Sequence, residues 1–311
     1  MTGQTMYHKP VLFHESLELL DVRPSGVYID ATFGGGGHSR GILERLGPDG
    51  RLFAFDQDPD AVVNTPEDTR FTLIRSNFEH LGRFLRFHQV DKVDGILADL
   101  GVSSHQFDVA SRGFSLREDG PLDMRMNPAV GQSVAEWLQT VDAHELAKTL
   151  AVYGDVVHPM RVAKAILTAL EGGRMNRTGD LVAVVEPLAP RGKGHKVLAQ
   201  VFQALRIAVN REMEVLEKFL VQGAEQLKTG GRFVVISYHS LEDRRTKVFF
   251  REGLLDGEAP RDTFGNRLVP FALITRKAIA PSAQEMMDNP RSRSARLRAA
   301  SKIQPFGSPS P

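Results

Sequence analysis

The chain has 311 residues, of which 41% are hydrophobic and 25% are charged, and its formal net charge is +1. This is the composition of an ordinary globular protein, with length for one large domain plus an insertion or for two domains. The complete absence of cysteine excludes disulfides, iron–sulfur clusters, thiolate zinc sites and cysteine nucleophiles. No apolar run approaches the roughly 18 residues of a membrane-spanning helix, and the first residues lack the apolar core of a signal peptide, so we expect a cytoplasmic protein.

Five short segments have the character of β-strands. Four of them are nearly continuous in apolar residues, as buried parallel strands are, and the first four recur at intervals of roughly 20 to 25 residues. That spacing is typical of β–α units and predicts an α/β sheet. The segments are Val27–Ala31, Leu52–Asp56, Phe71–Arg75, Val93–Leu100 and Arg232–Tyr238.

The stretch between the fourth and fifth strands carries only helical patterns, which predicts an inserted all-helical domain. Within it, Thr178 is placed as a helix N-cap and Gly172-Gly173 as a helix stop. One apolar face that continues from about Val197 to Leu227 predicts a single long helix leading back to the sheet. Shorter helices are expected at Ser133–Gln139, Ala143–Val152, Arg161–Glu171 and Asp180–Val185.

The end of the chain completes the predicted organisation. Leu268–Val269 and Ala272–Arg276 are expected to add antiparallel edge strands. The predicted domains are residues 1–105 for the first part of the sheet domain, 106–203 for the helical insertion and 204–303 for the second part. Residues 304–311, which are rich in proline and serine, are predicted to be a disordered tail.

The stretch from Tyr28 to His38, YIDATFGGGGH, is a strand followed by four glycines and the start of a helix. Glycine lets a backbone turn tightly and approach a ligand without a Cβ in the way. Asp56 follows at the end of the second strand, where its carboxylate can accept hydrogen bonds from a ribose. Strand, glycine turn, helix, strand and acid together indicate half of a doubly wound nucleotide-binding unit.

Two classes of ligand compete for this loop. A dinucleotide fingerprint requires G-x-G-x-x-G, but the position of the third glycine holds Ser39 or Arg40 in the two possible registers. The pattern acid-x-x-x-Gly-x-Gly of S-adenosylmethionine-dependent methyltransferases is met by Asp30, Gly34 and Gly36. The loop alone favours the methyltransferase modestly and leaves open a nicotinamide oxidoreductase or a glycine-rich turn without a ligand.

Polar residues follow the other strands as well. Ligands of open α/β sheets bind beyond the carboxyl ends of the strands, so several polar strand ends on one edge favour a site over isolated helix caps. The histidines show no metal-ligand spacing, and no essential metal is expected. The polar strand ends are Asp56–Asp58, Asn77–Phe78, Asp99–Gln106 and Ser237–Arg244.

The last part of the chain is basic. Arg244 to Lys302 contains 13 Lys and Arg against 6 Asp and Glu. Such a run favours contact with a polyanion through phosphate neutralisation, although a merely solvated basic tail is an alternative. The arginines predicted to bind RNA are Arg291, Arg293, Arg296 and Arg298.

Long segments of the chain resemble the bacterial 16S ribosomal RNA (cytosine-N4)-methyltransferase family, also called the RsmH or MraW family. The most specific are Asp119-Gly-Pro-Leu-Asp-Met-Arg125 and His239-Ser-Leu-Glu-Asp-Arg244, and the others span almost the whole chain in the family's order. Those others include His8–Leu12, Asp30–His38, Gly95–Gln106, Arg112–Ser115, Phe202–Ile207 and Asn289–Leu297.

The resemblance implies a Rossmann-like class I S-adenosylmethionine-dependent methyltransferase sheet and methylation of one cytosine amine in the decoding centre of 16S rRNA. The expected partner is that RNA within the small ribosomal subunit or its precursor, without a membrane. The implied cofactor residues are Gly36, Gly37 and His38 at the methionine end, Asp56 at the ribose, Phe78 and Asp99 beside the adenine, and Gln106 closing the pocket.

The chain departs from the family's usual pattern at Gln57, His105 and Tyr238, and more notably at Lys196–Gln200, which puts any RNA contact there in doubt. The resemblance names no acceptor for the cytosine N4 proton. The rim candidates are Asp119, Asp123, Arg125, His239, Glu242 and Arg244, each with a structural ion pair or helix cap as the alternative.

The expected chemistry is direct methyl transfer to the amine. Alignment of nitrogen, methyl and sulfur supplies much of the catalysis, and no cysteine is needed. The cytosine must leave its stack, and RNA recognition is expected to use the basic run and loops of the inserted domain. Two rival functions are a nicotinamide oxidoreductase and a non-catalytic ribosome-assembly factor.

Overall fold

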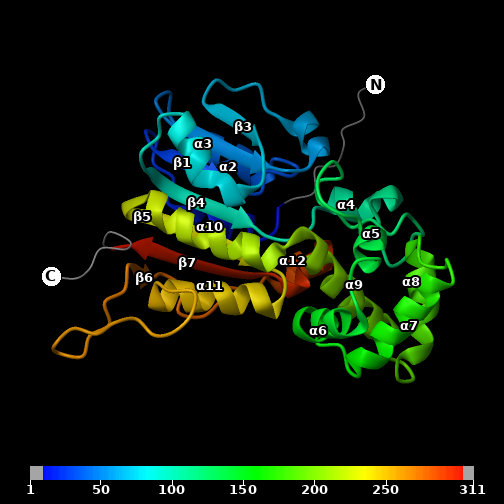
Figure 1. Ribbon diagram of the computed structural model, residues 1–311. Coiled ribbons are helices and arrows are strands. Elements are labelled where there is room, and N and C mark those ends of the chain that lie inside the picture. The colour runs from blue at the N-terminus through cyan, green and yellow to red at the C-terminus, as the bar shows by residue number, and fades with distance from the viewer. Residues whose placement is uncertain (1–9, 304–311) are drawn as a thin grey trace. The chain divides into compact units, whose positions relative to one another are not determined.

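The computed structural model describes residues 10–303 and divides into two units (Figure 1). The first unit combines the chain up to Gly101 with the chain from Glu214 onward, and the second runs from Val102 to Met213. The first nine and last eight residues lie outside the described part, and with them the predicted tail at 304–311. No helix in residues 10–303 is both long and apolar enough to cross a membrane.

The first unit is built on a seven-stranded sheet of order β3-β2-β1-β4-β5-β7-β6. β1 to β5 are mutually parallel where they pair, and β7 runs antiparallel to both of its neighbours. This arrangement is the predicted class I methyltransferase sheet, in which an antiparallel strand completes a parallel one. The strands are β1 (Val27–Asp30), β2 (Arg51–Asp56), β3 (Phe71–Arg75), β4 (Val93–Asp99), β5 (Leu227–Ser237), β6 (Phe271–Leu273) and β7 (Arg296–Lys302).

Helices cover this sheet and bury its apolar strands. Phe53 of β2 and Phe233 of β5 are among the largest fully buried side chains, which agrees with the nearly continuous apolar runs of four of the parallel strands. The α-helices are α1 (Phe13–Leu20), α2 (Gly37–Leu43), α3 (Leu81–Phe87), α10 (Glu212–Gln226), α11 (Ser240–Glu252) and α12 (Ala283–Asp288); short 3-10 helices are η1 (Pro59–Asn64), η2 (Phe78–His80) and η5 (Pro290–Ser294).

The second unit is helical and has its own apolar core, which includes Leu146, Ile166 and Leu205. Side chains cap its helices: Ser133 and Glu136 form a capping box on α5, and Asp142 accepts the first N–H groups of α6. Its elements are α4 (Ser104–Asp108), η3 (Ala110–Arg112), α5 (Val134–Leu138), α6 (Ala143–Gly154), α7 (Pro159–Glu171), α8 (Thr178–Val185), η4 (Glu186–Leu188) and α9 (Gly194–Asn210).

The unit boundaries differ from the sequence-based ones. The division falls after Gly101 and after Met213, whereas the sequence placed it after residues 105 and 203. The predicted boundary at residue 203 falls inside α9, which runs from Gly194 to Asn210. The stop of α7 at Gly172-Gly173 is confirmed, but α8 takes Arg177 as its N-cap and begins at Thr178.

The predicted single long helix from Val197 to Leu227 is wrong. Arg211 takes a left-handed conformation with φ 52°, which ends α9 and separates it from α10. The Arg206 guanidinium makes two hydrogen bonds of 2.7 and 2.9 Å with the Glu212 carboxylate across the break. A non-glycine residue with positive φ gives no local sequence signal, and the apolar spacing continues on both sides.

The basic run near the end of the chain forms a strand, which the sequence analysis missed. Arg296 to Lys302 is β7, inserted between β5 and β6, whereas Leu268–Val269 forms no strand. Every residue of β7 after Arg296 is buried except Ser301. Lys302 is held there because its ammonium donates to the backbone oxygens of Ala224 and Leu227.

Candidate functional site

The carboxyl ends of the parallel strands bring three aspartates to one edge of the sheet. Asp30 ends β1, Asp56 ends β2 and Asp99 ends β4. In the register of the sheet, Asp30 pairs with Ala54 on one side and Leu97 on the other, so the three strands finish within two residues of one another. This is the edge at which open α/β sheets bind ligands.

Asp56 fixes the glycine loop to the end of β2. Its Oδ2 accepts a 2.7 Å hydrogen bond from the Gly34 N–H, and its Oδ1 accepts one of 2.8 Å from the Asp58 N–H. The Asn64 amide donates to the Gly34 oxygen at 2.9 Å from the other side. Burial raises the pKa of Asp56 to about 6, against the effect of these donors.

The four glycines of the loop have two different roles. A Cβ on Gly34 or Gly35 would meet no atom within 4 Å, so this part of the loop borders open space. A Cβ on Gly37 would instead fall 2.2 Å from Pro10 Cγ, and one on Gly36, at φ +74°, would fall 2.9 Å from the Phe33 ring. Gly36 and Gly37 therefore permit close packing behind the loop, while Gly34 and Gly35 leave room in front of it.

Arg40 braces the loop from the first turn of α2. Its Nη1 donates to the Gly35 oxygen at 2.8 Å and its Nη2 to the Asn64 oxygen at 3.1 Å. The side chain is thus folded against the loop's own carbonyl groups.

Asp30 connects the elements that carry the site. It is fully buried and accepts 2.7 Å and 3.1 Å hydrogen bonds from the Ser39 hydroxyl and the Thr32 N–H. The Thr32 hydroxyl in turn accepts from the Asp99 N–H at 2.7 Å. Asp30 therefore ties β1 to α2 and, through Thr32, to the end of β4, and burial raises its pKa.

Asp99 has a strongly perturbed carboxyl group at this edge. The Tyr238 hydroxyl donates to its Oδ1 at 2.9 Å, and its side chain remains 23% exposed. Burial raises the pKa of Asp99 to about 7; the nearby carboxylates Asp30, Glu242 and Glu285 add to this, and the hydrogen bond from Tyr238 opposes it. Tyr238 entered the sequence analysis only as a departure from the family pattern, and its contact with Asp99 was not foreseen.

His38 lies beside Asp99 without forming an ion pair. The distance from its Nδ1 to Asp99 Oδ2 is 3.9 Å, and burial lowers the pKa of His38 to about 4, so the ring is neutral at pH 7. Its Nε2 is buried and has no hydrogen-bond partner. An orphaned polar atom next to the open glycine loop fits a site that a ligand completes.

Phe78 stands at the start of η2, next along the same edge. Asn77 positions it, since its side chain accepts from the Glu79 N–H at 2.9 Å and donates to Gln57 Oε1 at 3.1 Å. The Phe78 ring packs edge-on against Phe219 of α10, with centroids 4.9 Å apart, and stays partly exposed. Its partial exposure leaves surface for a ligand.

His239 and Glu242, two of the rim candidates, form the cap of α11. The Glu242 N–H donates to His239 Nδ1 at 3.4 Å, while Glu242 Oε2 accepts from the Tyr238 N–H at 2.9 Å. The two residues thus form the capping box of α11, the alternative to a role at the rim that the sequence left open. Asp243 binds Arg298 with hydrogen bonds of 2.7 and 3.0 Å.

The predicted residues of the second unit all have local structural partners. Asp119 pairs with Arg177 and accepts from the Gly179 N–H at 2.9 Å. Asp123 and Arg125 form a two-point pair at 2.8 and 2.7 Å. Gln106 is buried and completes a capping box with Ser103 on α4. The cofactor role of Gln106 and the catalytic role of the others stay predictions.

The four predicted RNA-binding arginines do not form one set. Arg291, Arg293 and Arg296 are exposed, but Arg298 is buried in β7 and engaged by Asp243. We therefore no longer propose Arg298 as an RNA contact, because its guanidinium group is already paired with Asp243 inside the fold.

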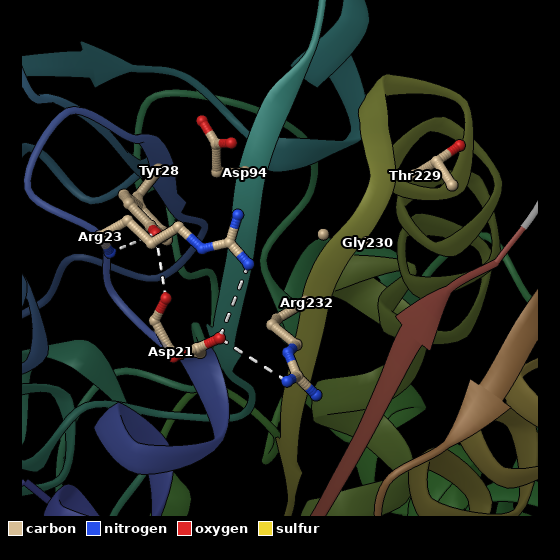
Figure 2. A pocket seen from close by; sticks show the side chains of 8 residues that line it. Asp21, Arg23, Tyr28, Asp94, Thr229, Gly230 and Arg232 are labelled. Atoms are coloured by element: carbon tan, nitrogen blue, oxygen red, sulfur yellow. Dashed lines mark hydrogen bonds and ion pairs between the residues drawn. The ribbon is translucent and has the colours of Figure 1, made fainter.

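A small cavity lies at the opposite edge of the sheet, where the parallel strands begin (Figure 2). Its volume of about 20 Å³ holds roughly one water molecule and no nucleoside. The Arg23 and Arg232 guanidinium groups lie 3.9 and 3.6 Å from the Asp21 carboxylate. The Tyr28 hydroxyl donates to the backbone oxygen of Asp21 at 3.2 Å. These contacts are made within the chain, and the cavity is too small, and lies too far from the carboxyl edge, to form part of a cofactor site.

Residues 5–303 match the MraW methylase family over nearly the whole chain. The chain belongs to this family. Its relatives include proteins named Ribosomal RNA small subunit methyltransferase H from Bacteroides fragilis, 50% identical over 96% of this chain and 98% of theirs, and from Flavobacterium psychrophilum, 52% identical over 94% and 100%. A solved rRNA methylase from Streptococcus thermophilus is 13% identical, with a TM-score of 0.41 and coverage of 96% and 100%.

Membership of a methylase family on a class I sheet confirms S-adenosylmethionine as the cofactor, and the protein is a methyltransferase. The residues of the carboxyl edge fit this ligand. S-adenosylmethionine carries a sulfonium and an ammonium group, and the edge offers Asp56 and Asp99 with no lysine or arginine bound to either in the described chain.

Proposed function

We propose that this protein transfers a methyl group from S-adenosylmethionine to the N4 amine of a specific cytosine in the decoding centre of 16S ribosomal RNA. The observation that carries the proposal is the identity of about half of all residues with small-subunit methyltransferases H over almost the entire chain. Such a substrate places the enzyme in the cytoplasm, with the small ribosomal subunit or its precursor as its partner.

The carboxyl edge of the sheet is proposed to hold the cofactor. Asp56 would accept hydrogen bonds from the ribose hydroxyls, since its carboxylate already lies at the end of β2 facing the loop. Asp99 and Phe78 would flank the adenine, and Gly36, Gly37 and His38 the amino-acid end. Gly34 and Gly35 are added to this set because they are the two loop positions with open space in front of them.

Bound S-adenosylmethionine supplies an electrophilic methyl group on a positively charged sulfur. In the proposed reaction a nitrogen–carbon bond forms at N4, the carbon–sulfur bond breaks, and the electron pair stays on sulfur as S-adenosylhomocysteine leaves. The extra N4 proton passes to water or a base. The protein's contribution is alignment of the two reactants and exclusion of competing water.

The absence of cysteine agrees with attack by an exocyclic amine, because methylation of a pyrimidine ring carbon through a cysteine adduct is excluded. The proposed RNA contacts are Arg291, Arg293 and Arg296, which form an exposed cationic group around η5. The loops of the second unit are proposed to contribute substrate recognition.

The test is incubation of the protein with methyl-labelled S-adenosylmethionine and small subunits from an unmethylated strain. Label should appear in 16S rRNA, and mapping of the modified nucleotide should give N4-methylcytosine at one position. Label on another base or on protein would reject the substrate. Absence of label with a protein that still binds subunits would favour the assembly-factor alternative.

A thermal shift experiment separates the cofactor classes. S-adenosylhomocysteine should raise the melting temperature because it binds only the folded chain, and NAD should not. A shift with NAD alone would favour the oxidoreductase alternative.

A further inference from the structure

The short helix α3 ends in an exposed face made of two arginines and one phenylalanine. Arg83, Arg86 and Phe87 are all exposed, and Phe87 keeps 78% of its surface open to solvent. Spacings of three and four residues place Arg83 beside both Arg86 and Phe87 on the helix surface. A large apolar ring beside cations, left open to solvent, needs a physical explanation.

The charge of this face is not balanced by acids. Neither Arg83 nor Arg86 has an ion-pair partner among residues 10–303. The neighbouring acid Glu79 is instead held by Lys218, whose Nζ lies 3.0 Å from Glu79 Oε2. A nitrogen of the Arg86 guanidinium lies 3.7 Å from where a Cβ on Gly82 would be, so this side chain folds back over the preceding turn.

The backbone under Phe87 is held firmly. The N–H groups of His88, Gln89 and Val90 donate to the oxygens of Phe84, Arg86 and Leu85 at 3.0, 3.1 and 2.9 Å. These bonds close the end of the helix and fix the direction in which Phe87 leaves it.

An aromatic series connects Phe87 to the sheet. Its ring meets the edge of His88 at 5.2 Å, and His88 lies 5.2 Å from Phe53. The Arg51 guanidinium covers the Phe53 ring at 4.8 Å. The backbone that carries the exposed ring is therefore anchored to the sheet, which lowers the conformational entropy lost when a partner binds there.

We propose that Arg83, Arg86 and Phe87 form a second RNA-contact surface, in which the arginines neutralise backbone phosphates and Phe87 stacks on an unpaired base. The unbalanced charge selects a polyanion, and an open aromatic face beside cations is the usual platform for single-stranded nucleic acid. The inference rests on the proposed function, which supplies the RNA.

The surface lies away from the carboxyl edge. α3 ends at Phe87 just before the chain enters the beginning of β4, and Asp99 lies at the other end of that strand. Contact here would add affinity for the small subunit without touching the reacting groups. The expected kinetic signature is a higher KM for subunits, with kcat and cofactor affinity unchanged.

The experiment measures binding of the full chain, saturated with S-adenosylhomocysteine, to unmethylated small subunits and to protein-free 16S rRNA. The variants are Phe87→Ala and the double change Arg83→Gln with Arg86→Gln. The matched controls are Phe264→Ala, at an 89% exposed ring elsewhere, and Arg276→Gln with Lys277→Gln, an equally exposed pair of cations.

Loss of one stacked base should weaken binding by roughly 5- to 150-fold in Phe87→Ala. Loss of two phosphate contacts should reduce the slope of log affinity against log salt by roughly 1.4 to 1.8 in the arginine variant. Melting temperatures and S-adenosylhomocysteine affinity should match the unmodified protein, because the three side chains are exposed and remote from the loop.

Three results would overturn the inference. The first is unchanged RNA affinity in these variants while the unmodified protein methylates subunits, which leaves the proposed function intact. The second is an equal loss in the control variants, which would indicate non-specific attraction. The third is weaker binding to intact subunits with unchanged binding to protein-free RNA, which would assign the contact to a ribosomal protein. Failure of the unmodified protein to bind or methylate RNA would reject the proposed function as well.

Discussion

The two edges of the parallel sheet place the same acidic residue type in opposite surroundings. At the edge where the strands begin, Asp94 Oδ2 accepts from the Val27 N–H at 2.8 Å and lies 2.8 Å from Lys228 Nζ, and Asp21 faces Arg23 and Arg232. At the carboxyl edge, Asp56 and Asp99 accept hydrogen bonds from neutral donors only.

This difference shows where the fold stabilises itself and where it is prepared for a ligand. Carboxylates with cationic partners are satisfied within the chain. Burial of a carboxylate without a cationic partner raises the free energy of its charged form. A cationic ligand lowers that free energy again. The two edges can be compared experimentally, and the largest expected effect is that of pH.

Stability should fall as the pH rises from about 4 to 8. A carboxyl group whose pKa is higher in the folded chain than in the unfolded chain stabilises the fold. This contribution is complete at pH values below the unfolded-state pKa, and it is lost as the pH rises through the folded-state pKa. Asp56, with a pKa of about 6, and Asp99, with a pKa of about 7, set this window. At about 1.4 kcal/mol per pKa unit, the two carboxyl groups contribute on the order of several kcal/mol. The lowered pKa of His38 acts in the opposite direction between about pH 4 and 6.5 and offsets part of this loss.

Chemical denaturation across this pH range measures the effect. S-adenosylmethionine should reduce the dependence of stability on pH, because its positive charge favours the ionised carboxylates. Its binding near pH 6.5 should therefore release protons from these carboxyl groups. Calorimetry in buffers of different ionisation enthalpy detects that release. A free energy of unfolding that does not change with pH in the absence of ligand would show that the carboxylates of the two edges do not differ in this way.

Asp99→Ala should weaken S-adenosylhomocysteine and S-adenosylmethionine binding by roughly 10- to 100-fold, the loss of hydrogen bonding to a charged group. It should also make the folded chain more stable at pH 8, because it removes a carboxylate that is costly to ionise. Titration calorimetry and denaturation measure the two changes. Unchanged cofactor affinity would exclude Asp99 from the site.

Asp94→Ala is the matched change at the other edge, and the expected effects are reversed. It leaves the Val27 N–H without its acceptor, so the free energy of unfolding should fall by about 1–3 kcal/mol. Cofactor affinity should be unchanged in the folded protein. A large loss of cofactor affinity without a loss of stability would show that the two edges are not functionally separate.

Tyr238→Phe should have the smallest effect. The hydroxyl donates to Asp99 and holds its pKa down, so its removal should raise that pKa further. Cofactor binding should then be roughly 2- to 10-fold weaker near pH 7 and unchanged near pH 9, where Asp99 is ionised in both proteins. A uniform loss at every pH would instead indicate a change in packing.

The sequence predicted the parts of the molecule that local patterns determine. The first four strands, the glycine loop and the aspartates at the strand ends depend on apolar runs, turn residues and one register rule, all visible in short segments. The family resemblance then supplied the cofactor class, which family membership and the sheet confirm.

The missed features depend on pairing between distant segments. Asp243 and Arg298 are 55 residues apart, so nothing in the basic run showed that one arginine is internal. The break at Arg211 has no glycine or proline to mark it. The hydrogen bond from Tyr238 to Asp99 joins the ends of two neighbouring strands, and only the folded sheet brings them together.

The position of β7 has a consequence for the order in which the sheet is completed during synthesis. Among residues 10–303, β7 is the last strand, yet it lies between β5 and β6. The Lys302 ammonium donates to the backbone oxygens of Ala224 and Leu227 at the end of α10. Until Arg296 to Lys302 has left the ribosomal exit tunnel, β5 presents an open edge and β6 has no partner strand. The helical second unit, whose residues precede β5, can form before the sheet on which the methyl donor is bound. The strand that completes the sheet is therefore synthesised after all the other strands of the described residues.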